Sequence, residues 1–154
     1  MAIYFIDSSA LVKRYIREIG LAWVLNLFDP TLNNEIFIAA ITGVEIIAAI
    51  TRRSRSRSIS ITDATLIRNQ FKSDLQTDYQ IIEITENIIN SAMILSENYG
   101  LRGYDAVQLA AGCAVNSLCI VHGLPPIIFI SADNELNSAA IMAGLMIENP
   151  NIYP

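Results

Sequence analysis

The sequence predicts an α/β protein in which a central, mostly parallel sheet is covered by helices on both faces. Short β-prone runs alternate along the chain with longer stretches whose apolar residues recur at helical spacing. Parallel strands need crossover connections, and these pack as helices against the sheet. The chain has 154 residues, 53% of them hydrophobic and 16% charged, which suits a compact globular fold. We therefore expect one domain spanning residues 1–154.

The N-terminal part predicts a strand, a turn and two helices. Residues 3–6 (IYFI) form a β-prone run that ends at Asp7. The run leads into residues 8–18, where apolar side chains recur every three or four positions, as in a helix. A second helix over residues 22–28 ends before Pro30, because proline cannot continue a helix.

The middle of the chain predicts one strand and two helices. Residues 36–39 (IFIA) read as a strand, and a helix that begins near Thr42 runs into a group of arginines. The next helix covers about residues 61–75, and its N-cap is Thr62 or Ser60, since hydroxyl side chains commonly accept the free N–H groups of a first turn.

The C-terminal part continues the alternation of strands and helices. Residues 79–84 (YQIIEI) look like a strand, and residues 86–99 look like a helix that ends before a glycine. A long apolar helix follows at residues 104–123, and two prolines then force a turn into the strand at residues 127–131. A last helix opens at Asp133 and runs to about residue 143.

The charge balance argues mildly against a protein that binds nucleic acid non-specifically. The formal net charge is −5, whereas affinity for phosphates usually comes from a basic surface. The basic residues are concentrated locally, however, in a segment that contains Arg52, Arg53, Arg55 and Arg57. This cluster is either a phosphate-binding edge or a solvated helix end.

We expect a cytoplasmic protein without a membrane-spanning segment. The N-terminus has no basic region followed by a long apolar core, so it does not read as a signal peptide. The apolar run at residues 36–50 is interrupted by Glu45 and is shorter than the roughly 18 residues of a typical membrane span. Cys113 and Cys119 lack the spacing of a zinc site and are expected to be buried thiols.

Four carboxylates stand at positions that suggest a site. Asp7 and Asp133 follow predicted strands, and ligands of open α/β sheets bind beyond the carboxyl ends of the strands. Each of the two could instead be an ordinary N-cap. Glu45 lies on a small, apolar helix face without a basic partner, so it either reaches to solvent or faces a cation. Asp105 opens the long apolar helix and could pair with Arg102.

Four segments resemble the acidic motifs of PIN-domain proteins, in the same order and over nearly the whole chain. They are FIDSSALVKRY, GVEIIAAI, LRGYDAVQLAA and FISADNELNSAA. The parts YDAVQLAA and SADNEL are most similar to VapC-type toxins. The resemblance implies a three-layer α/β/α PIN-like fold. It also implies a metal-dependent endoribonuclease that is the toxin of a VapBC-type toxin–antitoxin pair.

The resemblance further implies the roles of single residues. The catalytic and metal-binding acids are Asp7, Glu45, Asp105 and Asp133, and the hydroxyl residues that line the site are Ser8, Ser9 and Ser131. Independently of the family, a cluster of carboxylates without His or Cys suits Mg²⁺ or Mn²⁺ and not zinc. Hydrolysis by a metal-activated water would leave a 5′-phosphate and a 3′-hydroxyl.

Other function classes lack a residue that they need. A receiver domain needs a lysine near the last strand, but the only lysines are Lys13 and Lys72. A haloacid-dehalogenase-type phosphatase needs an aspartate where Ser9 stands, and dinucleotide binding needs a glycine-rich turn after the first strand. A non-catalytic PIN-like module that binds RNA or protein without cutting remains an alternative.

The expected partners follow from the resemblance. They are an RNA substrate, a VapB-like antitoxin and a second copy of the chain in a homodimer. The segment LAWVLNLF, with Trp23 and Phe28, either docks such a partner or packs into the core.

Overall fold

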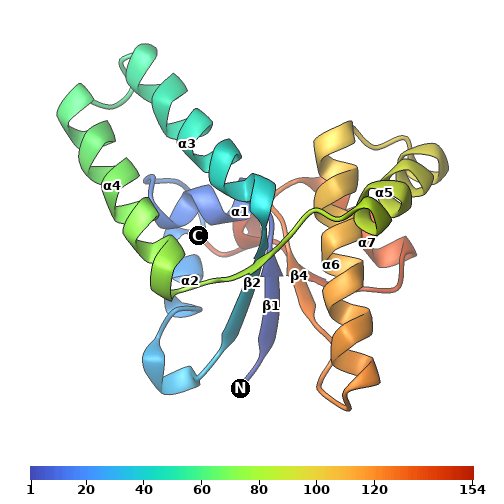
Figure 1. Ribbon diagram of the computed structural model, residues 1–154. Helices are drawn as coiled ribbons and strands as arrows, with labels where there is room; N and C mark the ends of the chain where they lie inside the picture. Colours follow the sequence, from blue (N-terminus) through green and yellow to red (C-terminus); the bar gives the residue numbers. More distant parts are fainter.

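The computed structural model describes all residues from 1 to 154 and has three layers, with a sheet between two groups of helices (Figure 1). The sheet has five strands in the order β3-β2-β1-β4-β5, and every neighbouring pair is parallel. The strands are β1 (Ile3–Ile6), β2 (Glu35–Ala39), β3 (Gln80–Ile82), β4 (Ile128–Ile130) and β5 (Met146–Glu148). The predicted α/β/α architecture is therefore confirmed.

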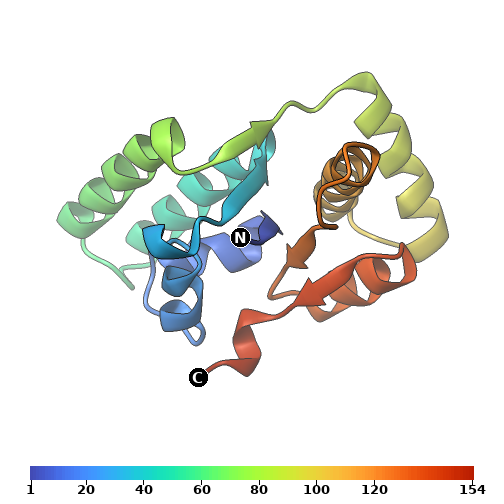
Figure 2. The same ribbon diagram turned by 90° about the horizontal axis from the view of Figure 1, so that it is seen from below.

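The helices divide between the two faces of the sheet (Figures 1 and 2). One face carries α1 (Ser8–Leu11), α2 (Leu21–Asn26), α3 (Ala40–Arg55) and α4 (Ile61–Thr77). The other face carries α5 (Glu86–Tyr99), α6 (Gly103–Val121) and α7 (Asn134–Met142). Three short 3-10 turns are η1 (Val12–Arg14), η2 (Pro30–Leu32) and η3 (Pro150–Ile152).

The two faces of the sheet bury two separate apolar clusters. Successive side chains of β1 point to opposite faces, as in any strand. Ile3 and Phe5 therefore join the cluster beneath α5, α6 and α7. Ile6 joins the cluster beneath α1, α3 and α4. Strands that bury both faces read as continuous apolar runs, which is why IYFI is recognisable in the sequence.

Several boundaries differ from those predicted. The helix expected near Thr42 begins at Ala40, and it has no side-chain cap. Ser60, and not Thr62, caps α4, because its Oγ accepts the N–H of Asp63 at 3.0 Å. The strand expected at residues 79–84 is limited to β3, and the edge strand β5 was not predicted.

The apolar helix α6 is the core helix of its layer. By length and composition it could cross a bilayer, but eight of its residues are buried inside the protein, as in a core helix of a soluble protein. Gly112 lets it approach the sheet, since a Cβ at this position would lie 2.8 Å from the ring of Phe129. The rings of Phe129 and Phe5 stack there at 5.6 Å. Cys113 and Cys119 form no disulfide.

The aromatic residues proposed for docking are largely used within the fold. Trp23 stacks on Tyr153 with ring centroids 4.8 Å apart. Phe28 packs edge-on against Tyr79 at 5.7 Å and beneath the guanidinium of Arg14 at 3.9 Å. Of the two interpretations, the packing one is therefore favoured. The contact of Trp23 also brings the C-terminal segment back beside α2 (Figure 2).

Candidate active site

The four predicted carboxylates come from elements that converge at the carboxyl edge of the central strands. Asp7 directly follows β1, and Asp133 follows β4, which is the parallel neighbour of β1. Glu45 lies in the second turn of α3, which leaves β2 without a loop. Asp105 lies in the first turn of α6. In open α/β sheets this edge is where ligands bind.

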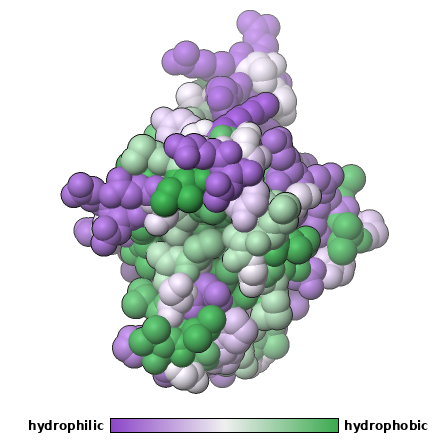
Figure 3. Space-filling model, turned by 90° about the vertical axis from the view of Figure 1, so that its right-hand side faces the viewer, coloured by the Kyte–Doolittle hydropathy of each residue, from purple (hydrophilic) through white to green (hydrophobic).

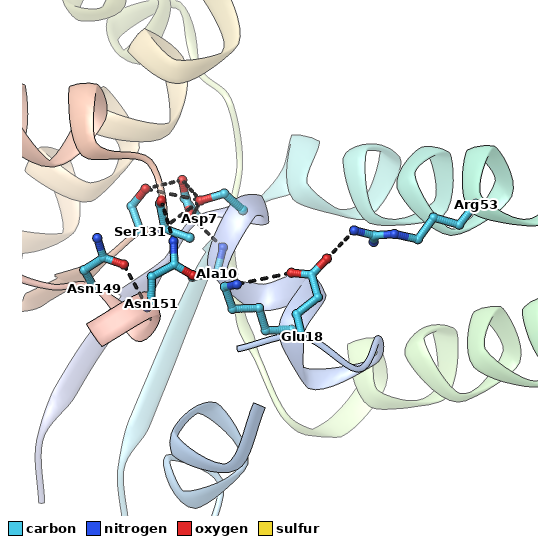
Figure 4. Close-up of polar contacts among 10 residues, drawn as sticks. Asp7, Ala10, Glu18, Arg53, Ser131, Asn149 and Asn151 are labelled. Atoms are coloured by element: carbon cyan, nitrogen blue, oxygen red, sulfur yellow. Dashed lines mark hydrogen bonds and ion pairs between the residues drawn. The ribbon is translucent and has the colours of Figure 1, made fainter. Parts of the chain in front are cut away.

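Asp7 is a buried carboxylate at the centre of a hydrogen-bond network (Figure 4). Only 2% of the residue is exposed. It accepts the N–H of Ala10 at 3.0 Å, the hydroxyl of Ser9 at 2.7 and 2.9 Å, and the hydroxyl of Ser131 at 2.8 Å. Asp7 is thus the N-cap of α1, but capping does not explain its complete burial beside other acids.

The environment of Asp7 disfavours its negative charge. Burial raises its pKa to about 7, against the opposing effect of the hydrogen bonds. The negative charge of Asp105 adds to this increase. A cation at the edge would offset both effects.

Ser9 and Ser131 join the ends of β1 and β4. Their Oγ atoms lie 3.2 Å apart. Ser9 Oγ also accepts the N–H of Ala132 at 3.0 Å, and Ser131 Oγ accepts the N–H of Asp133 at 3.1 Å. The two hydroxyls therefore fix Asp7 relative to the segment that carries Asp133.

Asp133 is the N-cap of α7. Its Oδ1 accepts the N–H groups of Glu135 at 2.9 Å and Leu136 at 3.1 Å. The C-terminal segment supports this turn, because the Asn151 amide donates to the carbonyl of Ala132 at 3.2 Å. As with Asp7, the cap leaves the carboxylate at the edge of the sheet.

The other acids of the edge influence the pKa of Asp105. Burial raises its pKa, and the negative charges of Asp133 and Glu45 raise it further. Arg102 lowers it, but no ion pair forms between the two side chains. The surface ion pair considered from the sequence is therefore absent.

Glu45 is held by a buried glutamine that the sequence interpretation missed. Gln108 of α6 is 1% exposed, and its Nε2 donates at 2.8 Å to both Glu45 Oε1 and Thr42 Oγ1. Its Oε1 has no hydrogen-bond partner. Glu45 therefore does not extend freely into solvent. One signal was available: Gln108 is a polar residue one helical turn after Asp105 on an otherwise apolar face.

A groove of about 910 Å³ runs along α3, and Glu45 is the one of the four acids that lines it. We call it the α3 groove. Its polar lining includes Ser8, Ser9, Glu45, Arg52 and Arg53, and its apolar lining includes Val12, Ile41, Val44, Ala48 and Tyr104. Arg52 lies seven residues after Glu45, which is two helical turns and thus the same side of α3.

The arginine cluster splits between two surfaces. Arg52 and Arg53 line the α3 groove, whereas Arg55 and Arg57 line a separate hollow at the start of α4. Arg53 also pairs with Glu18, which in turn accepts from Lys13 at 3.1 Å (Figure 4). Only two of the four predicted arginines therefore share a groove with Glu45.

The donor set fits a hard divalent cation in its chemistry. It consists of carboxylates and hydroxyls without His or Cys, and Mg²⁺ and Mn²⁺ prefer such oxygen ligands. No three acidic, His or Cys side chains lie close enough in this arrangement to hold one ion together. Of the four acids, Asp7 is buried, whereas Glu45, Asp105 and Asp133 are partly exposed.

The three-layer fold is the PIN-like fold expected from the sequence, and comparisons with known proteins agree. No family model matches the chain. Ribonuclease VapC45 and Ribonuclease VapC49, both of Mycobacterium tuberculosis, are each 24% identical to it over 154 residues, which is 100% of either protein. The resemblance to VapC-type proteins seen in the four motifs is therefore confirmed over the full length.

Solved structures share the fold. VapBC2 from Rickettsia felis, bound to a promoter DNA fragment, matches with a TM-score of 0.63, 18% identity and coverage of 96% of this chain and 98% of that one. A toxin–antitoxin complex from Klebsiella pneumoniae matches with a TM-score of 0.60 and 18% identity, and the match covers 96% of this chain and 97% of that one. PAE2754 from Pyrobaculum aerophilum matches with a TM-score of 0.62 and 19% identity, and the match covers 95% of this chain and 89% of that one.

Proposed function

We propose that this protein is an endoribonuclease that depends on Mg²⁺ or Mn²⁺ and acts as the toxin of a VapBC-type pair. The observation that carries the proposal is the acidic edge of the sheet, where Asp7 is buried and the charges of Asp133 and Glu45 act on Asp105. The full-length similarity to proteins named Ribonuclease VapC supports RNA as the substrate.

The protein's own groups divide the work as follows. Asp7, Glu45, Asp105 and Asp133 would hold the metal, which would supply charge stabilisation at phosphorus and an activated water. Ser9 and Ser131 fix the Asp7 carboxylate through their hydroxyls, and Gln108 fixes Glu45.

Asp105 is the proposed proton acceptor. Its side chain is only partly buried, so a water molecule can reach it. The products are a 5′-phosphate and a 3′-hydroxyl.

The proposed partners are an antitoxin and a second copy of the chain, in the cytoplasm. Two of the similar structures are described as a toxin–antitoxin complex and as VapBC2, and they support an antitoxin. Exposed apolar side chains lie on the outer face of the second helical layer, among them Ile89, Met93 and Ile94 of α5 (Figure 3). This face suits a homodimer contact.

The first test is cleavage of a labelled RNA by the purified, partner-free protein. We expect cleavage with Mg²⁺ or Mn²⁺, none in excess EDTA, and products whose 5′ ends carry phosphate. Asp105→Asn and Glu45→Gln should each lower the cleavage rate at least about a hundredfold, as expected for a proton acceptor and a metal ligand. Circular dichroism checks that both variants fold.

Two outcomes contradict the proposal. Cleavage that persists in EDTA would remove the role of the metal. RNA binding without any cleavage by the unmutated protein would favour the non-catalytic module.

A further inference from the structure

Tyr104 is the one aromatic side chain that the fold leaves exposed. It is 69% exposed, whereas every other Phe, Tyr and Trp is buried or half-buried. Aromatic side chains gain more than most from burial, so a single exposed ring beside a candidate active site is informative. Tyr104 contributes little to the core.

The position of Tyr104 connects the acids to the α3 groove. It precedes Asp105 in the first turn of α6 and lines the groove together with Glu45 and Arg52. Val44, which is also exposed, adds an apolar surface to the same groove. The groove therefore combines an aromatic ring, an apolar wall and a guanidinium within reach of one site.

Arg52 supplies a positive charge that no ion pair in the protein engages. Among the ion pairs of the protein, Arg53 has a carboxylate partner, and Arg52 has none. An unpaired guanidinium in a groove favours an anionic ligand. Together with a ring that can stack on a base, this charge favours nucleic acid over an apolar protein segment.

We propose that Tyr104 stacks on an unpaired base of the RNA next to the phosphate held at the acids, while Arg52 contacts the backbone. The proposal rests on the ribonuclease function proposed above and assigns to Tyr104 a role in positioning the RNA beside the acids. Proteins read single strands by stacking bases on aromatic side chains, whereas duplex RNA keeps its bases paired and is contacted through sugars and phosphates. Stacking tolerates any base, so the preference concerns strandedness and not sequence.

The test compares three variants that keep or remove the ring. Tyr104→Phe and Tyr104→Trp keep a stacking surface, and Tyr104→Leu removes it. We expect Tyr104→Leu to raise KM for a single-stranded RNA about tenfold, in the range of one lost base–aromatic stack. Tyr104→Phe should match the unmutated protein, and kcat should change little in all three. Val121→Ala, at the exposed far end of the same helix, is the matched control.

A spectroscopic measurement separates stacking from a merely structural role. In a Trp23→Phe background the only tryptophan is the one introduced at position 104. Its fluorescence should be quenched by a single-stranded RNA and not by the same strand annealed to its complement. Thermal melts check that each variant folds.

The outcomes are distinguishable. If Tyr104→Leu and Tyr104→Phe bind and cleave single-stranded RNA equally well, the stacking role is overturned and the ribonuclease function stands. If Tyr104→Leu instead weakens self-association or binding of a partner protein without changing KM, Tyr104 is a protein contact and the proposal fails. If the unmutated protein neither binds nor cleaves RNA, the proposed function fails first.

Discussion

At the scale of single residues, Asp7 combines a structural and a chemical role. Its Oδ1 caps α1, and the same carboxylate accepts two serine hydroxyls in a fully buried position. A buried carboxylate without a cation is unfavourable even when it is hydrogen-bonded. The negative charge of Asp7 therefore lowers the stability of the metal-free protein.

This cost predicts a pH dependence of stability. Because the pKa of Asp7 is raised from 3.8 to about 7, its contribution favours folding at low pH and is lost as the pH rises through that interval. The metal-free protein should thus lose stability between about pH 4 and pH 7. Asp7→Asn should flatten this dependence and increase the free energy of unfolding at pH 8 by up to about 4 kcal/mol.

Urea unfolding in EDTA at several pH values measures the effect. Asp29→Asn is the matched control, because Asp29 is an exposed N-cap of η2 whose pKa is lowered, and it should leave the slope above pH 5 unchanged. If the free energy of unfolding depends on pH equally in the Asp7→Asn variant and the unmutated protein, the pKa of Asp7 is not raised in the folded state.

The sequence predicted the residues at strand ends better than those that depend on packing. Asp7 and Asp133 follow apolar runs, so their place at the sheet edge is a local property of the sequence. Gln108 was missed because its partners, Glu45 and Thr42, come from the opposite helical layer. That contact exists only once β2 lies between the two layers.

At the scale of elements, the approach of α6 to the sheet depends on a missing side chain. A Cβ at Gly112 would lie 2.8 Å from Phe129 Cδ2 and 3.5 Å from Phe5 Cδ1, and both rings are fully buried. Neither ring has room to move away in a close-packed interior. The glycine thus sets the distance between the helix and the strands that carry Asp7 and Asp133.

Gly112→Ala should accordingly destabilise the protein by about 1–2 kcal/mol, because overpacking outweighs the higher helix propensity of alanine. Gly43 in α3 is the matched control, since a Cβ there meets nothing within 4 Å. Gly43→Ala should stabilise the protein by about 0.5–1 kcal/mol. Chemical denaturation of both variants measures the two signs, and a stabilised Gly112→Ala variant would contradict the packing argument.

A hydrogen-bond network holds η1, the turn that follows α1. Arg14 of η1 donates to Asp78 and Tyr79 at 2.6 Å, and the adjacent Tyr15 donates to Asp74 at 2.7 Å. Burial raises the pKa of Tyr79 to about 12, so this phenol stays protonated at neutral pH. The network ties η1 to the end of α4 and explains why Tyr79 precedes β3 instead of lying in it.

The elements that the sequence missed are those whose existence depends on a neighbour. The edge strand β5 has three residues, of which Met146 is exposed, and it is defined by pairing Ile147 with Phe129 of β4. A run this short has no periodicity of its own. By contrast, the helices α4, α5 and α6 were predicted within about two residues, because their repeats are long.

At the scale of the whole molecule, the charge distribution matters more than the net charge. The net charge of −5 disfavours RNA binding over the surface as a whole. The arginines of α3, however, lie in its last turns, where positive charge also stabilises the helix C-terminus. Arg52 lies on the same side of α3 as Glu45 and lines the α3 groove, whereas Arg55 lines the hollow at the start of α4.

This geometry predicts that the two halves of the arginine cluster differ in RNA binding. Each phosphate neutralised on a single strand adds about 0.7 to the slope of log affinity against log salt, because counterions are released. Arg52→Gln should therefore weaken binding of a single-stranded RNA and lower that slope by about 0.7. Arg55→Gln, which removes the same charge from the same helix outside the α3 groove, should leave the slope unchanged. Fluorescence anisotropy at several salt concentrations, in a Glu45→Gln background that prevents cleavage, measures both. Equal losses from the two variants would mean that the arginines act only through net charge, and that the groove does not direct the RNA backbone.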